Sequence, residues 1–371
     1  MNVNHSMNDL RFMRMAHSLA MKARGFTSPN PLVGAVVVRG GKVVGKGYHR
    51  GAGMPHAEIV ALEEAGSRAR NGILYVTLEP CCHLKKRTPP CVPKVVESGV
   101  RRVVIAMEDP NPRVSGKGIR ALRKKGIEVE VGVLSEKARS YNESYIKFVT
   151  TGRPFVILKV AASLDGKVST ARGESRWITG ESSRKFVHQL RQQCDGILVG
   201  IGTVLSDDPL LTVRLPKQPI REPFRIVLDT RLRFPLKAKM IRKADPSKTI
   251  IVTGRKGSKA KQKALEERGV RVLREKSDQG GIDMLSLIKK LGGMSLTSLL
   301  IEGGPKINAS ALASKIVNKV IFFLAPKIIG GTQAKGAIAG NSPESLKKAL
   351  SLERMKVTPM GKDWMVEGYL H

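Results

Sequence analysis

Three short segments near the start of the chain carry the side chains that most constrain how it can fold. They are His56-Ala57-Glu58, Glu79-Pro80-Cys81-Cys82-His83 and Pro89-Pro90-Cys91. One histidine and two well-separated cysteines can supply three ligands of a tetrahedral zinc and leave the fourth position for water. Because these segments are distant in sequence, a shared metal requires a fold that brings all three to one point.

Glu58 gives the predicted metal site a possible catalytic role. If residues 57–59 open a helix, the Glu58 carboxylate can face the open metal position. Zinc deaminases have this arrangement, in which the metal activates a water at neutral pH and a carboxylate that is not a ligand moves the protons.

The alternative is a closed zinc site that only holds a loop together, with Cys82 or His83 as a fourth protein ligand. We favour the open site because Glu58 lies close to the histidine ligand. The ligand segments also lie where strands or loops meet helix N-termini, whose dipoles favour thiolates. Successive side chains diverge, so Cys81 and Cys91 are a better ligand pair than Cys81 and Cys82.

Composition indicates two domains with mostly aliphatic cores and a strongly basic chain. The 371 residues are enough for two domains, and 41% of them are hydrophobic although only 4% are aromatic. The net charge of +34 is spread over both halves of the chain. Such a balance fits phosphorylated or polyanionic ligands, and the alternative is a solvated basic surface without a specific partner.

Cysteine placement and hydropathy indicate a cytoplasmic enzyme with no membrane partner. Three of the four cysteines lie in one loop, which is typical of a metal site and not of a disulfide framework. The fourth, Cys194, is expected to be a small core residue. Residues 1–14 lack the apolar core of a signal peptide, and no apolar run reaches the roughly 18 residues of a membrane span.

The first part of the chain alternates between strand and helix patterns. Residues 9–25 have helical periodicity, with Asp9 as the expected N-cap and Gly25 as the expected end. The alternation predicts an α/β sandwich whose later part is largely parallel. We expect strands over 32–38, 42–49, 73–78, 103–107 and 129–133, and helices over 57–69, 92–98, 116–125 and 139–148.

The run Thr150-Thr151-Gly152-Arg153-Pro154 breaks this pattern, so we place a domain boundary there, between residues 1–149 and 150–371. A new strand pattern begins at once, and the sheet is expected to end in an antiparallel pair. We expect strands over 155–161, 196–200, 225–229, 248–253, 270–273, 298–302, 320–324, 355–357 and 364–369, and helices over 182–193, 258–268, 283–291 and 306–313.

The first domain resembles the deaminase half of the bifunctional riboflavin-biosynthesis deaminase–reductase family. Besides the metal segments, the resemblance rests on Asn30-Pro31-Leu32-Val33-Gly34, Gly47-Tyr48-His49, Thr88-Pro89-Pro90-Cys91 and Asp109-Pro110-Asn111-Pro112. A long loop between the two cysteine ligands is typical of this family. The loop here, residues 82–90, is one residue longer than usual and has Cys82 where serine is usual.

The resemblance implies a cytidine-deaminase-like three-layer domain in which His56, Cys81 and Cys91 bind zinc and Glu58 is catalytic. It further implies substrate contacts from the following residues: Asn30, His49 and His83 at the pyrimidine or its ribose, and Arg87, Asp109 and Asn111 at the ribose-phosphate end. For two of these the sequence alone leaves an alternative, since Asn30 could be a turn residue and His49 an ordinary histidine at a strand end.

The second domain has weaker local motifs. Glu302-Gly303-Gly304-Pro305 follows an apolar strand and opens a helix, so its backbone N–H groups could bind a phosphate, although the two glycines could equally form a plain tight turn. Gly200-Ile201-Gly202 lacks the third glycine of a dinucleotide-binding fingerprint. A Rossmann domain is therefore disfavoured.

Three further segments, together with this turn, are similar to the reductase half of the same family. They are Lys159–Lys167, Gly173–Thr179 and Gly202–Arg214. The resemblance implies a dihydrofolate-reductase-like fold and NADPH as cofactor. It places NADPH against Ala161, Trp177, Thr203, Asp207, Gly304 and Pro305, and the reductase substrate against Ser175, Arg191, Leu211, Arg214 and Glu302.

Three residues of this domain carry open alternatives or hypotheses. Trp177 could instead be a core aromatic residue. Arg255 and Lys256 follow an expected strand and are candidates for binding the 2′-phosphate that distinguishes NADPH from NADH.

The expected function is therefore two consecutive steps of riboflavin biosynthesis. The first is zinc-dependent hydrolytic deamination of 2,5-diamino-6-(5-phosphoribosylamino)pyrimidin-4-one. The second is NADPH reduction of the ribosyl group of 5-amino-6-(5-phosphoribosylamino)uracil to ribityl. We expect small phosphorylated pyrimidines as ligands, a homo-oligomer and no nucleic acid.

Two other functions remain open at this point. A zinc-dependent nucleic-acid base deaminase with a basic RNA-binding second domain would suit the charge, but the chain has few aromatic side chains for stacking bases. A binding protein with a structural zinc would lose no activity on replacement of Glu58.

Overall fold

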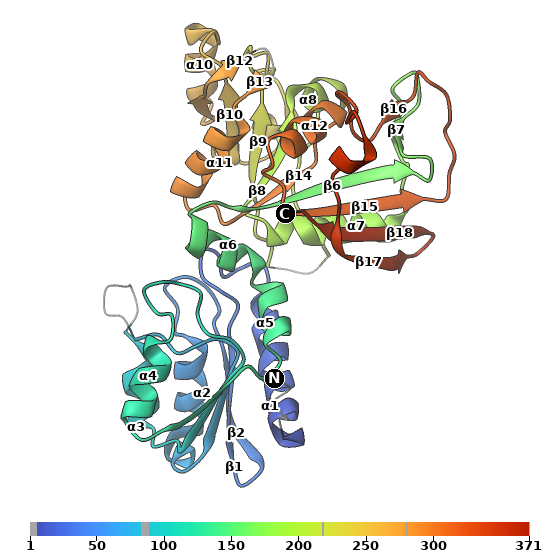
Figure 1. The fold of residues 1–371 in the computed structure, drawn as a ribbon. Coiled ribbons are helices and arrows are strands. Elements are labelled where there is room, and N and C mark those ends of the chain that lie inside the picture. Colours follow the sequence, from blue (N-terminus) through green and yellow to red (C-terminus); the bar gives the residue numbers. More distant parts are fainter. Residues whose placement is uncertain (1–5, 83–88, 217–218, 279–280, 371) are drawn as a thin grey trace. The chain divides into compact units, whose positions relative to one another are not determined.

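The computed structural model describes residues 6–82, 89–216, 219–278 and 281–370, so His83 and Arg87 lie outside the described residues (Figure 1). The chain divides into two compact units, Met1–Gly152 and Arg153–His371. Each unit is built on one main sheet. No described helix has both the length and the apolarity needed to cross a membrane.

The first unit has a five-stranded sheet in the order β2-β1-β3-β4-β5. β1 pairs antiparallel with β2 and β3, whereas β3, β4 and β5 are parallel, which confirms the predicted hairpin and parallel later part. The strands are β1 (Gly34–Arg39), β2 (Lys42–Tyr48), β3 (Ile73–Val76), β4 (Arg102–Ile105) and β5 (Glu128–Val131). The helices are α1 (Met7–Ala20), α2 (Ala57–Ala65), α3 (Cys91–Glu97), α4 (Lys117–Lys124), α5 (Ser135–Tyr141) and α6 (Glu143–Thr151), with 3-10 turns at Met21–Ala23 and Gly66–Ala69.

Helices α1 and α2 cover opposite faces of this sheet. A Cβ atom added at Gly34 would lie 2.0 Å from the carbonyl oxygen of Ala16 in α1, and one added at Gly47 would lie 2.2 Å from that of Ala57 in α2. Gly34 and Gly47 point to opposite faces, because Gly47 pairs directly with Ala35, the residue after Gly34. The unit therefore has three layers, and glycine lets both helices approach the sheet closely.

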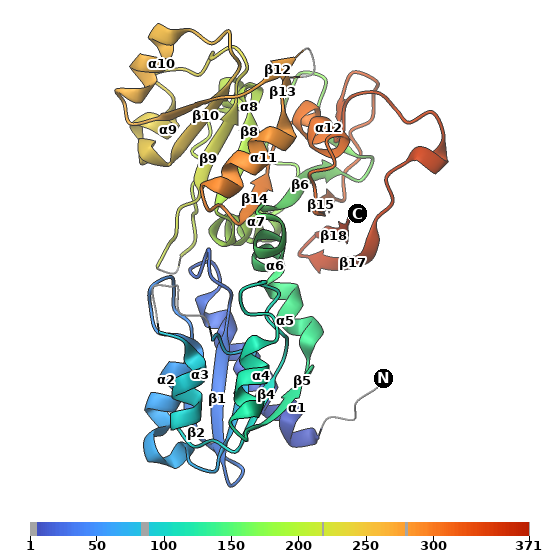
Figure 2. The same ribbon diagram turned by 60° about the vertical axis from the view of Figure 1, so that its left-hand side comes forward.

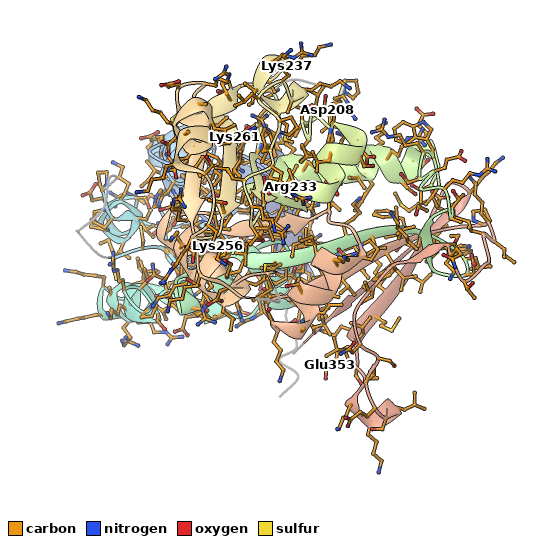
Figure 3. The ribbon with its side chains drawn as sticks, turned by 90° about the horizontal axis from the view of Figure 1, so that it is seen from above. Asp208, Arg233, Lys237, Lys256, Lys261 and Glu353 are labelled. Atoms are coloured by element: carbon orange, nitrogen blue, oxygen red, sulfur yellow. The ribbon has the colours of Figure 1, made fainter. Side chains whose placement is uncertain are left out.

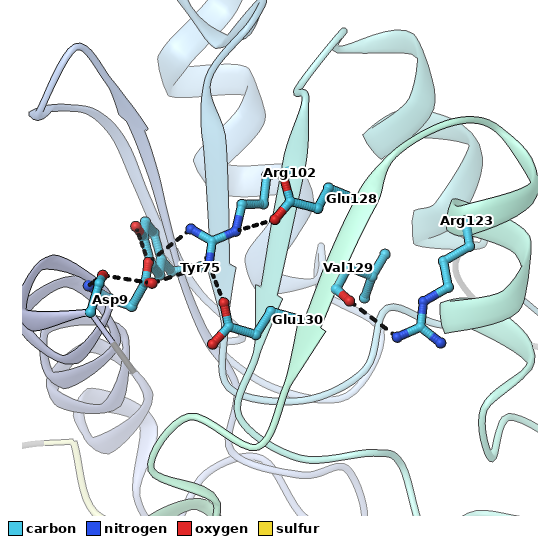
Figure 4. A network of polar contacts seen from close by, with 8 residues as sticks. Asp9, Tyr75, Arg102, Arg123, Glu128, Val129 and Glu130 are labelled. Atoms are coloured by element: carbon cyan, nitrogen blue, oxygen red, sulfur yellow. Dashed lines mark hydrogen bonds and ion pairs between the residues drawn. The ribbon is translucent and has the colours of Figure 1, made fainter. Parts of the chain in front are cut away.

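The start of α1 differs from the prediction. Ser6 is the N-cap, and its hydroxyl accepts the backbone N–H of Asp9. Asp9 is buried, and its carboxylate accepts hydrogen bonds from Tyr75 on β3 and Arg102 on β4 (Figure 4). Arg102 also pairs with Glu130 on β5, so this network ties α1 to three strands. Asp9 was mistaken for a cap because its partners are distant in sequence.

The expected connecting helix over 139–148 is two helices, α5 and α6, divided at Asn142. The Asn142 side chain is buried, accepts the N–H of Leu32 at 2.8 Å and donates to the carbonyl oxygen of Leu32 at 3.1 Å. These two hydrogen bonds of Asn142 therefore fix the segment that leads into β1.

The second unit has a nine-stranded sheet in the order β11-β10-β9-β8-β14-β6-β15-β18-β17 (Figure 2). All neighbours from β11 to β15 are parallel, and β18 and β17 add the predicted antiparallel pair. The sheet strands are β6 (Phe155–Ser163), β8 (Gly196–Gly200), β9 (Phe224–Leu228), β10 (Thr249–Thr253), β11 (Arg271–Arg274), β14 (Ser298–Ile301), β15 (Lys319–Ala325), β17 (Glu353–Met360) and β18 (Asp363–Tyr369).

Helices cover both faces of this sheet, which explains its almost wholly apolar central strands. Residues of α11 and α12 pack on one face, and residues of α7, α8 and α10 contribute to clusters on the other. The helices are α7 (Glu181–Gln193), α8 (Ile201–Asp207), α9 (Lys239–Arg242), α10 (Lys259–Glu266), α11 (Met284–Gly293) and α12 (Pro305–Ala313), with 3-10 turns at Pro246–Lys248 and Leu346–Lys348. Short pairs join β7 (Lys167–Ser169) to β16 (Lys335–Gly336), and β12 (Ser277–Asp278) to β13 (Gly281–Ile282).

Candidate active sites

The three predicted metal ligands meet in the first unit. His56 directly precedes α2, Cys81 lies in the loop after β3, and Cys91 is the first residue of α3. The Nδ1 atom of His56 lies 3.5 Å from the Sγ of Cys81 and 3.2 Å from the Sγ of Cys91. The two sulfur atoms are 3.4 Å apart. The Cys91 N–H donates to the carbonyl oxygen of Cys81 at 2.9 Å, which holds the two cysteine segments together.

These distances fit one zinc ion. Zinc bonds of about 2.3 Å to sulfur and about 2.0 Å to nitrogen place tetrahedral ligand atoms roughly 3.5 Å apart. Among the described residues, His56, Cys81 and Cys91 form the one group of histidine, cysteine or acidic side chains close enough to hold a metal ion. Cys82 does not join it, so a closed site that uses Cys82 is not formed.

Glu58 lies in the first turn of α2 and is 3% exposed. Burial is the main cause that raises the pKa of its carboxyl above the ordinary value, and the neighbouring Cys81 adds to the shift. A raised pKa suits a carboxyl that must both accept and release a proton.

Gly47 on β2 sets the position of the helix that carries His56 and Glu58. A Cβ atom at Gly47 would lie 2.2 Å from the Ala57 carbonyl oxygen and 2.6 Å from the Ala61 nitrogen, both in α2. These contacts are to backbone atoms, so α2 itself would have to move.

We expect Gly47→Ala to displace the start of α2, to lower the zinc content of the purified protein and to destabilise it by about 1–3 kcal/mol. Metal analysis and urea unfolding measure both effects. Gly293→Ala is the control, because a Cβ atom there meets nothing within 4 Å. Wild-type zinc content and stability in Gly47→Ala would contradict this account of the helix position.

Asn30 and His49 lie beside the metal ligands. The Asn30 side-chain nitrogen is 3.0 Å from the Nε2 of His49, and the Nδ1 of His49 is 3.1 Å from the Pro55 carbonyl oxygen. Nδ1 therefore donates to Pro55 and Nε2 accepts from Asn30. Burial lowers the pKa of His49, whose ring centre is 5.2 Å from that of His56.

Asp109 is buried and is held by its own loop and by α6. It accepts the Asn111 N–H at 2.9 Å and the Tyr145 hydroxyl at 2.9 Å. Burial raises its pKa to about 6. Asn111 accepts the Arg113 N–H at 3.0 Å, which stabilises the same turn. Tyr145 was not predicted, because nothing in the sequence connects α6 with this loop.

Glu79 is a second residue of this region whose role was not predicted. Its buried carboxylate accepts four backbone N–H groups at 2.8–3.1 Å. These groups belong to Asp109, Gly116, Gly118 and Ile119, in the loop after β4 and the first turn of α4. Glu79 thus fixes the Asp109 loop next to the Cys81 segment. Its place just before a metal-ligand motif was the only sequence signal.

The second unit has two adjoining cavities of about 900 and 700 Å³. They share five lining residues, so they form one continuous depression at the carboxyl ends of the central strands, where α/β sheets bind ligands. The shared residues are Val168, Ser175, Thr203, Asp207 and Gly304.

Most of the predicted residues of this unit line these cavities. Leu211 lines neither; its side chain is buried in the cluster that contains Ile197 and Val199. Arg255 and Lys256 also line neither cavity. The lining residues that were predicted are Ala161, Ser175, Trp177, Arg191, Thr203, Asp207, Arg214, Glu302, Gly304 and Pro305.

Glu302 is the centre of a buried ion-pair group in the smaller cavity. It pairs with Arg191 at 2.7 Å and with Lys159 at 3.0 Å, and its side chain is 7% exposed. Burial opposes ionisation, but the two cations overcome it and hold the pKa of Glu302 well below its usual range. Arg191 also donates to the Thr212 carbonyl oxygen at 3.1 Å. Lys159 was not predicted as a site residue, although it begins a segment that was singled out.

Two further predictions about this unit can be assessed. Trp177 is 62% exposed at the cavity wall, with the Arg184 guanidinium 4.6 Å from its ring centre, so it is not a core aromatic residue. Pro305 is the first residue of α12, as expected, and Gly304 is the N-cap of this helix. A Cβ atom at Gly304 would meet nothing within 4 Å, so the backbone there is open to the cavity.

The loop after β9 presents two arginines to the larger cavity. Arg231 and Arg233 are exposed and line the cavity. Leu232, which lies between them, and Phe234, which follows Arg233, are buried in the core. The buried carboxylate of Asp229 accepts the Phe234 N–H at 2.7 Å and fixes the loop. Arg233 and Lys256, on different loops, are labelled in Figure 3.

Both units match known protein families. Residues 6–107 match the cytidine and deoxycytidylate deaminase zinc-binding region, and residues 154–366 match the RibD C-terminal domain. The chain is 44% identical over 359 residues to the riboflavin biosynthesis protein RibD of Aquifex aeolicus, covering 96% of this chain and 97% of that protein. It is 38% identical to the Escherichia coli protein of the same name, over 96% of this chain and 98% of that protein.

Solved structures agree over nearly the full length. RibD of Acinetobacter baumannii is 34% identical with a TM-score of 0.89, over 98% of this chain and 99% of that one. A diaminohydroxyphosphoribosylaminopyrimidine deaminase/5-amino-6-(5-phosphoribosylamino)uracil reductase of Thermotoga maritima is 35% identical with a TM-score of 0.84 and the same coverage.

Proposed function

The chain belongs to the RibD family of riboflavin-biosynthesis proteins, and on that premise we propose which residues carry its two reactions. It is a bifunctional enzyme, a deaminase and a reductase. We assign deamination to residues 1–149 and reduction to residues 150–371. The substrates are those in the name of the Thermotoga relative. The observation that carries the assignment is the His56–Cys81–Cys91 cluster beside a buried Glu58.

In the first reaction, His56, Cys81 and Cys91 would hold zinc, which when bound supplies Lewis-acid activation of a water. Glu58 takes a proton from the attacking water and delivers it to the pyrimidine ring and then to the leaving ammonia. Its first-turn position on α2 keeps the carboxylate beside the ligands, and its raised pKa lets it hold the proton between the two transfers.

The remaining deaminase residues bind and orient the substrate. Asn30 and His49 support each other beside His56 and contact the pyrimidine or its ribose. Asp109 and Asn111, held by Glu79 and Tyr145, contact the ribose-phosphate end together with Arg87. His83 completes the predicted set at the pyrimidine.

In the second reaction, NADPH is bound by the predicted residues of the two adjoining cavities, and when bound it supplies a hydride to C1 of the ribosyl group. Opening the ribose ring also needs a proton at the ring oxygen. We assign this proton to Lys159, the ammonium group that Glu302 holds at the cavity wall. The substrate contacts are Ser175, Arg191, Arg214 and Glu302, of which Glu302 and Arg191 act as one charged unit. Leu211 is left out of this set because it lines neither cavity.

Arg231 and Arg233 are better candidates for the 2′-phosphate of NADPH than Arg255 and Lys256, because they line the larger cavity. The Asp229 carboxylate fixes the backbone of their loop through the Phe234 N–H, and guanidinium groups bind phosphates through paired hydrogen bonds. The Arg255 backbone is instead held outside the cavity by Arg274, which donates to its carbonyl oxygen at 3.0 Å.

Arg233→Ala is expected to lower kcat/KM for NADPH at least tenfold with little effect on NADH, since a charge-assisted hydrogen bond is worth about 1.5–3 kcal/mol. The NADPH/NADH preference measured at 340 nm tests this. Arg255→Ala should leave the preference unchanged. Loss of preference in Arg255→Ala and not in Arg233→Ala would reverse the assignment.

Homo-oligomerisation and a cytoplasmic location stay proposals. An apolar strip on the edge hairpin formed by β17 and β18 supports homo-oligomerisation. Met355, Val357 and Trp364 are 50–58% exposed, and the strand register places them on one face of β17 and β18. The opposite face carries Met365, which is packed in the core. Exposed apolar strips of this kind are typical of protein interfaces.

A direct test gives the protein the diaminopyrimidinone substrate with NADPH and follows absorbance at 340 nm. Oxidation of NADPH is the expected result. Ammonia release from tRNA without NADPH oxidation would instead support a nucleic-acid base deaminase, which the full-length family match does not favour.

A further inference from the structure

Trp177 places a large apolar ring at the wall of the smaller cavity of the second unit without core packing to hold it. The residue is 62% exposed, and it lies in a segment, residues 170–180, that forms neither helix nor strand. A side chain this exposed loses rotational entropy when it is held in one orientation. Contacts with neighbouring side chains therefore have to fix the ring.

Arg184 makes such a contact. Its guanidinium carbon lies over the Trp177 ring, 4.6 Å from the ring centre, which is the geometry of a cation–π interaction. The same guanidinium donates from Nη1 to the Thr179 carbonyl oxygen at 2.7 Å. Arg184 is thus held at one end by the backbone of the Trp177 segment and covers one face of the ring.

The helix that carries Arg184 is itself fixed to the sheet. Arg184 lies in the first turn of α7, whose N-cap is Gly180. The Gly180 N–H donates to the buried carboxylate of Asp363 on β18 at 2.7 Å, and the Ser183 hydroxyl donates to the same carboxylate. The guanidinium therefore projects from a rigid base.

Other side chains hold the backbone of this segment and do not orient the ring. The Lys327 Nζ donates to the Trp177 carbonyl oxygen at 2.8 Å. Arg176 donates from Nη2 to the carbonyl oxygen of Asp207, the last residue of α8, at 3.2 Å. Backbone and ring are consequently positioned by different residues, and a change at Arg184 can act on the ring alone.

We propose that Arg184 is a positioning residue for the cofactor: it holds the Trp177 ring so that the opposite face stacks on the nicotinamide end of NADPH. This inference rests on the proposed function, in which Trp177 contacts NADPH. Trp177 and Lys159 line the smaller cavity, where the hydride must be delivered, whereas Arg231 and Arg233 line the larger one. Flat rings bind aromatic side chains by offset stacking.

The role of Arg184 differs from that of a phosphate ligand, because its guanidinium is engaged by the ring and by the Thr179 carbonyl oxygen. Its contribution is preorganisation: a ring that is already held loses less entropy when the cofactor binds. Loss of Arg184 should therefore weaken NADPH binding and leave the hydride-transfer step unchanged.

The experiment compares Arg184→Ala and Arg184→Lys in the full-length protein. Arg354→Ala is the control, because that guanidinium also lies over an aromatic ring, Tyr369, but outside both cavities. KM for NADPH and kcat are measured at saturating reductase substrate. The chain has two tryptophans, so fluorescence anisotropy in a Trp364→Phe background reports the mobility of Trp177.

We expect Arg184→Ala to raise KM for NADPH about three- to fivefold, the effect of one partly exposed cation–π contact, with kcat unchanged. The anisotropy of Trp177 should fall. Arg184→Lys should recover most of both effects, because an ammonium group keeps the charge over the ring and a donor for Thr179. Arg354→Ala should change neither quantity.

A double replacement tests whether Arg184 acts through the ring. In a Trp177→Ala background, which should itself raise KM for NADPH, adding Arg184→Ala should cause no further increase. A further increase of the same size would overturn the proposal in favour of direct contact with the cofactor. Wild-type KM and anisotropy in Arg184→Ala would also overturn it.

Failure of the underlying function would have a different signature. A wild-type KM for NADPH in Trp177→Ala would refute the cofactor contact of Trp177, and with it the proposal, even if the anisotropy of Arg184→Ala had fallen. A wild-type protein that does not oxidise NADPH with its reductase substrate would refute the proposed function itself.

Discussion

Glu58→Gln is expected to lower the rate of ammonia release by roughly 10²–10⁴-fold, the usual contribution of general acid–base catalysis. The replacement keeps the size of a buried side chain but removes its ability to carry a proton. None of the three metal ligands is altered, so zinc content should stay at the wild-type level. Ammonia release and metal analysis on the same preparation measure both quantities.

The second unit provides an internal control for this variant. Reduction of the deaminated substrate by NADPH should proceed at the wild-type rate, because Glu58 lies in the other unit. Glu63→Gln, an exposed position on the same helix, should release ammonia normally. Wild-type deamination by Glu58→Gln would contradict the catalytic role and would favour a zinc site that is purely structural.

Lys159→Met is expected to lower kcat of the reductase by roughly 10²-fold or more, because it removes the proposed proton donor to the ribose ring oxygen. It leaves the Glu302–Arg191 pair in place, so binding of the substrate should change less than kcat. Single-turnover oxidation of NADPH at 340 nm measures the chemical step.

Lys319→Met is a matched control for this replacement. Lys319 pairs with Glu367 at 3.3 Å and has the same exposed side-chain fraction as Lys159, 14%, but it lies outside both cavities. Its replacement should leave reduction unchanged, and deamination should be unaffected in both variants. Equal losses in the two variants would point to general destabilisation and would exclude Lys159 as the proton donor.

The elements that were predicted well depend on local sequence. The β1–β2 hairpin follows from an apolar run and a Gly40-Gly41 turn, and the start of α12 follows from Gly304 and Pro305. The errors concern contacts between distant segments. Asp9 seemed to be a helix cap, but it is buried against Tyr75 and Arg102, and no local pattern reports such partners.

The same distinction applies to the sites. The metal ligands were found because their residue types and spacing are specific to zinc. Glu79, Tyr145 and Lys159 were missed because each acts through a partner more than 20 residues away, such as Glu302 for Lys159. Arg255 was chosen as a phosphate ligand because it follows a strand, yet the arginines that line the cavity lie in the loop after β9, the parallel strand next to β10.

The most direct test of the account is the ratio of ammonia released to NADPH oxidised when the wild-type protein receives the diaminopyrimidinone substrate. If one chain performs both steps in sequence, ammonia release should precede NADPH oxidation and the final ratio should be one to one. Glu58→Gln should suppress both signals, and added phosphoribosylaminouracil should restore only the oxidation. NADPH oxidation without ammonia release, or ammonia release that never leads to oxidation, would contradict the assignment of two consecutive reactions to this chain.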